Sequence, residues 1–170
     1  MGERGPRKRL ALDANVPLDL AADLDFAHDF CQDFQARGYS LLLAPTAAEE
    51  IFLIHRNAQH PQQRLATKAL RDLTMWGVKL LELKAHLQPV AKSIGRRFAE
   101  SLIRAGHLPP SEVNDGIILA EAALEEIPVL VTRDKHLLDI EDLDLLVCLQ
   151  AADLAPVKPV HPRLLWKAIQ

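Results

Sequence analysis

Short apolar runs separated by longer amphipathic segments characterise the sequence. The runs KRLALD, YSLLLAP, VKLLELK, VLVTRD and LDLLVCL have the length of strands. Between them, apolar residues recur at helical spacing, as at Leu20, Leu24, Ala27, Phe30 and Phe34. We predict strands at residues 8–13, 39–45, 78–84, 129–134 and 143–149. We predict helices at residues 19–38, 46–57, 61–77, 88–106 and 108–128.

This alternation of strands and helices determines the expected fold class. Strands that alternate with helices form a parallel sheet with helices on both faces. The runs LLL and VLV are continuously apolar, as strands buried on both faces must be. We therefore expect a three-layer α/β/α fold with a central, mostly parallel sheet. We divide the chain into a basic N-terminal arm (1–8), one domain (9–155) and a C-terminal tail (156–170).

Charge and composition exclude several classes of protein. The net charge of −3 gives no global basic field for nucleic acid, although the first ten residues carry four basic groups and one acid. That arm is either a solubilising tail or a contact to phosphates. No apolar run approaches the roughly 20 residues that span a membrane, and no apolar signal region follows the basic N-terminus. We therefore expect a cytoplasmic protein without a membrane partner, in which Cys31 and Cys148 are reduced rather than disulfide-bonded.

Acidic residues follow the predicted strands. Asp13 and Asp134 end the first and fourth runs, and Glu49 and Glu50 lie in the first turns of the helix after the second run. Asp115 lies near the start of the helix that leads into the fourth run. Because ligands of open α/β sheets bind beyond the carboxyl ends of the strands, we expect these acids to share one edge of the sheet.

Each of these acids also has an ordinary explanation. Asp13, Asn15 or Asp134 would suit a helix cap, and Glu50 or Asp115 would favour a helix dipole. Together they are costly, because clustered carboxylates repel one another unless a cation joins them. Oxygen ligands alone suit Mg²⁺ or Mn²⁺. A different acidic set, on the outer face of the helix predicted at 19–38, is interpreted as a solvated surface; it comprises Asp19, Asp23, Asp25, Asp29 and Asp33.

Other chemical signatures are missing from the sequence. The seven histidines include His55 and His60, but no cysteine pair accompanies them as a zinc site would need. The patterns GxxxxGK[ST], GxGxxG and GxSxG do not occur. These absences argue against a structural zinc site, the common nucleotide cradles and a serine nucleophile elbow.

Four short motifs resemble those of the PIN domain family. They are LDANV, PTAAEEI, NDGIILAEA and VTRDKHLL, and they occur in the family's order over most of the chain. PIN domains are metal-dependent ribonucleases, and many are VapC-like toxins of toxin–antitoxin pairs. The resemblance implies that Mg²⁺ or Mn²⁺ is held by four catalytic acids, with Glu49 as the alternative to Glu50: Asp13, Glu50, Asp115 and Asp134. It also implies that Asn15 and Thr132 support them.

The resemblance further implies an RNA substrate, an antitoxin partner and a homodimer. The chain is longer than the small toxins, so a solitary RNA-processing nuclease is an alternative to a toxin. Basic residues that would guide RNA, unless they are ordinary surface charges, are Arg96, Arg97, Arg104, Arg133 and Lys135. Two other functions stay open: a non-catalytic module that binds RNA or protein, and a phosphotransfer or phosphohydrolase module.

Overall fold

Five parallel strands form the centre of the fold. The structure is a computed structural model that describes residues 8–170, so most of the N-terminal arm predicted at residues 1–8 lies outside the described residues. The strands are β1 (Arg9–Leu12), β2 (Ser40–Leu43), β3 (Val78–Leu80), β4 (Val129–Val131) and β5 (Lys158–Val160). They lie in the order β3-β2-β1-β4-β5, and every neighbouring pair is parallel.

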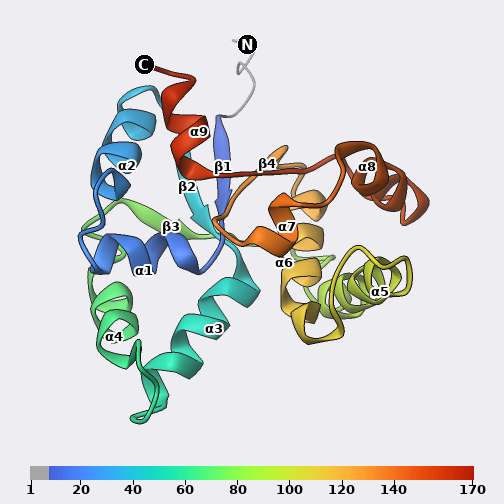
Figure 1. Cartoon of the computed structure of the whole chain (residues 1–170), viewed down its shortest axis with the longest axis horizontal. Coiled ribbons are helices and arrows are strands. Elements are labelled where there is room, and N and C mark those ends of the chain that lie inside the picture. Colours follow the sequence, from blue (N-terminus) through green and yellow to red (C-terminus); the bar gives the residue numbers. More distant parts are fainter. Residues whose placement is uncertain (1–7) are drawn as a thin grey trace.

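Helices flank this sheet on both sides (Figure 1). They are α1 (Asn15–Ala21), α2 (Ala27–Ala36), α3 (Pro45–Arg56), α4 (Gln63–Asp72), α5 (Ala91–Arg104), the 3₁₀ turn η1 (Pro110–Glu112), α6 (Val113–Leu124), α7 (Lys135–Leu138), α8 (Asp142–Ala151) and α9 (Pro162–Lys167). Helix α1 packs on α2 and α4, α5 packs on α6 and α8, and α3 contacts both α4 and α6. The predicted three-layer α/β/α class is confirmed.

The central strands are deeply buried in the core. Ala11, Leu12, Leu43, Leu130 and Val131 are wholly inaccessible to solvent. Their continuous apolar character follows from burial on both faces of the sheet. These strands therefore provide rigid supports for the residues that follow them.

Helices α5 and α6 approach each other unusually closely. A Cβ atom placed on Gly116 would lie 2.5 Å from the Cβ of Ala99, so only glycine fits at this point of contact. A Cβ atom placed on Gly95 would lie 3.0 Å from Cγ2 of Ile117, a less severe contact. The glycine of the NDG motif therefore fixes the beginning of α6, and with it the preceding residue, Asp115, against α5.

The helix predicted at 19–38 is in fact two helices. Helix α1 begins earlier than predicted, at Asn15, and ends before Asp23, whose φ of 50° is left-handed. The chain turns there and starts again at Ala27. Aspartate tolerates the left-handed conformation, and an apolar stripe continuing across the turn hid the break from the periodicity.

The strand predicted at 143–149 is wrong, because these residues belong to helix α8. Leu145 and Leu149 face the core, while Leu143, Leu146 and Val147 are exposed. A helix that is apolar on both faces has no helical periodicity in its sequence, and a short apolar run of this kind is equally typical of a strand.

The fifth strand lies instead in the segment expected to be a C-terminal tail. Within residues 156–170, β5 pairs with β4, and α9 packs on α2. The strand has only three residues and contains Pro159, which cannot donate to a ladder. An edge strand tolerates this because one side has no partner. The domain boundary at residue 155 was a prediction from composition, and no break in the sheet marks it.

Candidate metal centre

Strands β1 and β4 end side by side, and this brings two of the predicted site segments together. Leu12 pairs with Val131 in the parallel register, and the backbone N–H of Asp13 donates to the carbonyl of Val131. Asp13 and Thr132, each the next residue of its strand, are therefore neighbours, and Asp134 follows two residues later. Asp13 is only 3% exposed although it carries a carboxylate.

A hydrogen-bond network fixes the Asp13 carboxylate. The Thr132 hydroxyl donates to Asp13 Oδ2 at 2.7 Å and accepts the backbone N–H of Asp134 at 2.9 Å. The Asn15 amide donates to both Asp13 Oδ2 and Thr132 Oγ1, each at 3.3 Å. Asn15 Oδ1 accepts the backbone N–H of Arg133 at 3.2 Å. Asn15 and Thr132 thus connect the two loops and orient Asp13.

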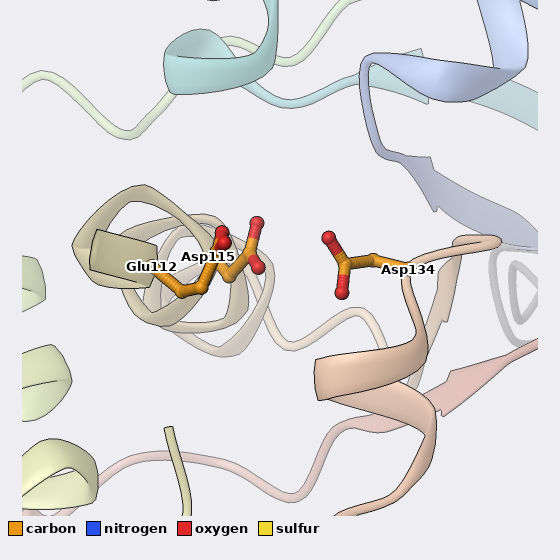
Figure 2. A group of neighbouring side chains, drawn as sticks. All are labelled: Glu112, Asp115 and Asp134. Carbon is orange, nitrogen blue, oxygen red and sulfur yellow. The ribbon is translucent and has the colours of Figure 1, made fainter. Parts of the chain in front are cut away.

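Asp134 is a helix cap that also faces the other acids. Its Oδ1 accepts the backbone N–H of His136 at 2.7 Å and so caps α7. Its side chain points toward Asp115 across a gap (Figure 2). The capping explanation therefore holds for Asp134 without removing it from the cluster. Asp13 makes no such cap, because α1 begins after Ala14 without a side-chain cap.

Two acids at the beginning of α6 complete this side of the site. Asp115 lies in the first turn of α6 and is 6% exposed, and Glu112 ends the preceding 3₁₀ turn. One ligand atom each of Glu112, Asp115 and Asp134 lies within 4.8 Å of the others (Figure 2). The prediction missed Glu112. The signal that was available is its spacing of three residues from Asp115, which places both on one helical face.

Glu50 and Glu49 face different surroundings. Burial first, and the Asp13 carboxylate second, raise the pKa of Glu50 to about 7. Glu49 is exposed and lies 2.9 Å from the ammonium of Lys92 on α5. Of the two candidates left open by the sequence, Glu50 is therefore the one that shares the electrostatic field of the other acids.

The acids of the cluster make one another difficult to ionise. Burial, followed by the charges of Asp13 and Asp134, raises the pKa of Asp115 to about 9. Burial also raises the pKa of Asp13, against the hydrogen bonds it receives. A divalent cation would reverse this balance by favouring the ionised carboxylates.

Asp115 Oδ2 provides the structural test of whether a cation fits here. Within residues 8–170 it is one of two buried side-chain N or O atoms without a hydrogen-bond partner, the other being Arg9 Nε. A buried carboxylate oxygen without a donor is costly. The available ligand atoms are all carboxylate oxygens, the type that Mg²⁺ and Mn²⁺ prefer. The residues therefore fit a hard divalent ion.

The predicted basic residues do not form one group. The Arg133 guanidinium forms a two-pronged ion pair with Asp19, with N–O distances of 2.5 and 2.6 Å. Asp19 is thus buried and paired, not part of a solvated acidic face as predicted. Arg97 and Arg104 border a groove of about 530 Å³ beside α8. Arg96 and Lys135 are exposed.

A wider groove lies apart from the carboxylates. Its volume is about 1390 Å³, and Phe52, Leu53, Leu70 and Leu80 are among the residues that line it. Glu49 borders it, but none of Asp13, Glu50, Glu112, Asp115 and Asp134 does. The shape of this groove therefore provides no argument about the chemistry of the acids.

Comparison with known proteins agrees with the motif resemblance. A model of the PIN domain family matches residues 10–143. A chain in the crystal structure of VapBC2 from Rickettsia felis, bound to a DNA fragment from their promoter, superposes with a TM-score of 0.57. The alignment covers 90% of this chain and 98% of that chain at 12% identity, so the likeness concerns the fold alone. No curated protein matches the sequence.

Proposed function

The chain belongs to the PIN domain family, and on that premise we propose that it is a metal-dependent endoribonuclease. The observation that carries the proposal is Asp115, a buried side chain that lies among other carboxylates and has one oxygen, Oδ2, without a hydrogen-bond donor. Buried carboxylates that lie close together repel one another, and a bound cation would offset this repulsion and stabilise the fold. A phosphodiester substrate also needs positive charge at the point of attack.

Asp13, Glu50, Asp115 and Asp134 would hold Mg²⁺ or Mn²⁺, which supplies a lowered pKa of bound water and charge stabilisation at the phosphate. Asn15 and Thr132 hold Asp13 in one orientation by their hydrogen bonds. No side chain of the cluster acts as a nucleophile, so we expect products with 5′-phosphate and 3′-hydroxyl ends and no covalent intermediate.

Exposed basic residues would guide the RNA strand by electrostatic attraction. We propose this role for Arg96, Arg97, Arg104 and Lys135, which are all exposed. Arg133 was predicted to join them, but its guanidinium is occupied by Asp19, and its main role would be structural. Substitution of the exposed group should weaken RNA binding without changing the reaction.

The partners are proposed by analogy with the family and with one structural neighbour. The R. felis structure is a VapBC2 complex with promoter DNA. By analogy we propose that this chain is the toxin of a toxin–antitoxin pair in the cytoplasm, acting as a homodimer on RNA.

In residues 8–170 there is no helix long and apolar enough to cross a bilayer.

The test is cleavage of a panel of single-stranded RNAs by the purified protein with Mn²⁺ or Mg²⁺ and with EDTA. We expect metal-dependent cleavage that Asp13→Asn abolishes while the melting temperature stays high. Asp29→Asn, an exposed aspartate of α2, is the matched control and should cleave normally. Full activity of Asp13→Asn would refute the site assignment.

Two further results separate the alternatives. Metal binding without cleavage of any RNA would favour a non-catalytic binding module. Release of inorganic phosphate from a phosphomonoester would favour a phosphohydrolase. Neither alternative has a specific feature of the structure in its favour, and LDAN lacks the second aspartate two residues on that many phosphohydrolases need.

A further inference from the structure

We propose that Glu112 is a fifth metal-binding carboxylate, and that it forms one side of the metal centre together with Asp115 and Asp134. The inference rests on the proposed function, because it concerns the same ion. It adds a ligand that none of the four sequence motifs contains. Glu112 lies outside the NDGIILAEA motif and belongs to a different element, the turn η1.

The geometry of the three acids suits a single ion. Around an octahedral Mg²⁺ ion, neighbouring oxygen ligands lie about 3.0 Å apart and opposite ones about 4.2 Å, from a metal–oxygen distance of about 2.1 Å. Ligand atoms of Glu112, Asp115 and Asp134 lie within 4.8 Å of one another, so one ion between them would draw the three side chains inward. Figure 2 shows Glu112 and Asp115 together at the start of α6, facing Asp134 across the gap.

The hydrogen bonds within the cluster favour metal binding on the side of Glu112 and Asp115. Asp13 Oδ1 accepts the backbone N–H of Ala14, and Asp13 Oδ2 accepts from Thr132 and Asn15. Asp13 thus accepts three hydrogen bonds, which leaves one lone pair of Oδ1 to bind an ion. Asp115 Oδ2 has no hydrogen-bond donor, and it belongs to a side chain that is more than nine-tenths buried. The acid with an unsatisfied oxygen is thus Asp115, whose carboxyl group lies beside that of Glu112.

The competing role for Glu112 is an ion pair with His136. The separation between Glu112 Oε1 and His136 Nε2 is 3.9 Å, longer than a hydrogen bond, and the Glu112 side chain is about a third exposed. Such a contact leaves the carboxylate free to bind a metal. The pair also provides a control. If Glu112 acted only through its ion pair with His136, substitution of either residue would have the same effect.

The experiment is calorimetric titration of Mn²⁺ into the full-length protein and its variants, with metal-free melting temperatures measured alongside. We expect Glu112→Gln to weaken Mn²⁺ binding about tenfold or more, since ligand charge strongly tunes affinity. Its metal-free melting temperature should not fall, because one of several repelling charges is removed. Glu112→Asp should bind Mn²⁺ better than Glu112→Gln.

Two control variants define the result. Glu100→Gln, on the exposed side of α5, and His136→Gln should both bind Mn²⁺ like the wild type. The inference is overturned if Glu112→Gln binds normally while Asp115→Asn does not; the proposed function then stands. It is also overturned if His136→Gln loses as much affinity as Glu112→Gln. If the wild type binds no Mn²⁺, both the inference and the proposed function fail.

Discussion

Buried carboxylates occur in two kinds of surroundings in this protein, and the difference separates structure from function. Asp19, Glu121 and Asp115 are 8%, 3% and 6% exposed, so they are almost equally buried. Asp19 is paired with Arg133, and both oxygens of Glu121 accept hydrogen bonds from Thr46, one from the backbone N–H and one from the hydroxyl. Asp115 keeps one oxygen without a donor. Among these equally buried acids, Asp115 is therefore the one whose hydrogen-bonding capacity the described residues leave unsatisfied.

Asp19 and Glu121 also hold the elements of the candidate metal centre in place. Arg133 directly precedes Asp134, and its pairing with Asp19 ties that loop to α1. Glu121 lies on α6 with Asp115, and it binds Thr46, one turn before Glu50 on α3. Ordinary polar contacts therefore align the elements that carry the candidate ligands.

The largest effect should come from Asp115→Asn. Loss of this carboxylate should lower RNA cleavage about a thousandfold, since metal-assisted charge stabilisation is worth several kcal/mol. Mn²⁺ binding should fall in parallel, which titration would measure. Because the amide cannot ionise, the metal-free variant should melt at a higher temperature than the wild type at pH 9. Asp29→Asn is the control, and cleavage by Asp115→Asn at the wild-type rate would contradict the comparison.

The stability of the metal-free protein should fall as pH rises from about 5 to 9. The pKa values of Asp115, near 9, and of Glu50 and Glu121, near 7, exceed those of the unfolded chain. The folded state therefore holds more protons than the unfolded state in this range, and the free energy of unfolding decreases with pH. Thermal melting across the range measures this decrease.

Added Mn²⁺ sharpens this experiment. Bound Mn²⁺ should reverse the part of the decrease in the free energy of unfolding that is due to Asp115 and Glu50, which lie in the cluster. The part due to Glu121 should remain, because Thr46 and not a metal is its partner. Melting temperatures that rise steadily from pH 5 to 9 without metal would be inconsistent with these raised pKa values.

A smaller effect on stability is expected from Arg133→Ala. The variant leaves Asp19 buried with no partner for its charge, so the free energy of unfolding should fall by about 2 kcal/mol. Chemical denaturation would measure this loss. Asp19→Asn combined with Arg133→Ala should recover part of it. Lys135→Ala, a change at an exposed neighbour, should change the free energy of unfolding by less than about 0.5 kcal/mol. If Lys135→Ala lost as much stability as Arg133→Ala, the loss could not be assigned to the pair of Arg133 with Asp19.

The fold was predictable wherever local pattern and tertiary environment agree. The buried central strands carry continuous apolar runs, and the sequence shows them directly. The wrong element types lie at the C-terminal end, where the pattern misleads. Helix α8 is apolar on two faces, and β5 is a three-residue edge strand containing proline. The conformation of both segments depends on the elements that pack against them, and a short stretch of sequence does not contain this information.

The candidate site was predictable for a similar reason. Asp13 and Asp134 follow strands, so parallel topology alone brings them to one edge. Glu112 was missed because it lies in a 3₁₀ turn rather than in a predicted motif. The pairing of Arg133 with Asp19 joins residues 114 positions apart, and only the folded chain shows it. From the sequence alone, Arg133 was assigned to the residues that would guide RNA, and that role stays a prediction.

The smallest effect should come from Glu49→Gln, and it sharpens the comparison within a single helical turn. Glu49 is exposed and its ion pair with Lys92 lies in solvent, so the variant should cleave RNA and bind Mn²⁺ normally and lose at most about 0.5 kcal/mol of stability. The matched variant, Glu50→Gln, removes a carboxylate that Asp13 and Asp134 both influence, and it should bind Mn²⁺ more weakly. Both changes are chemically identical and one residue apart. A loss of Mn²⁺ affinity in Glu49→Gln but not in Glu50→Gln would reverse the assignment of the glutamate ligand.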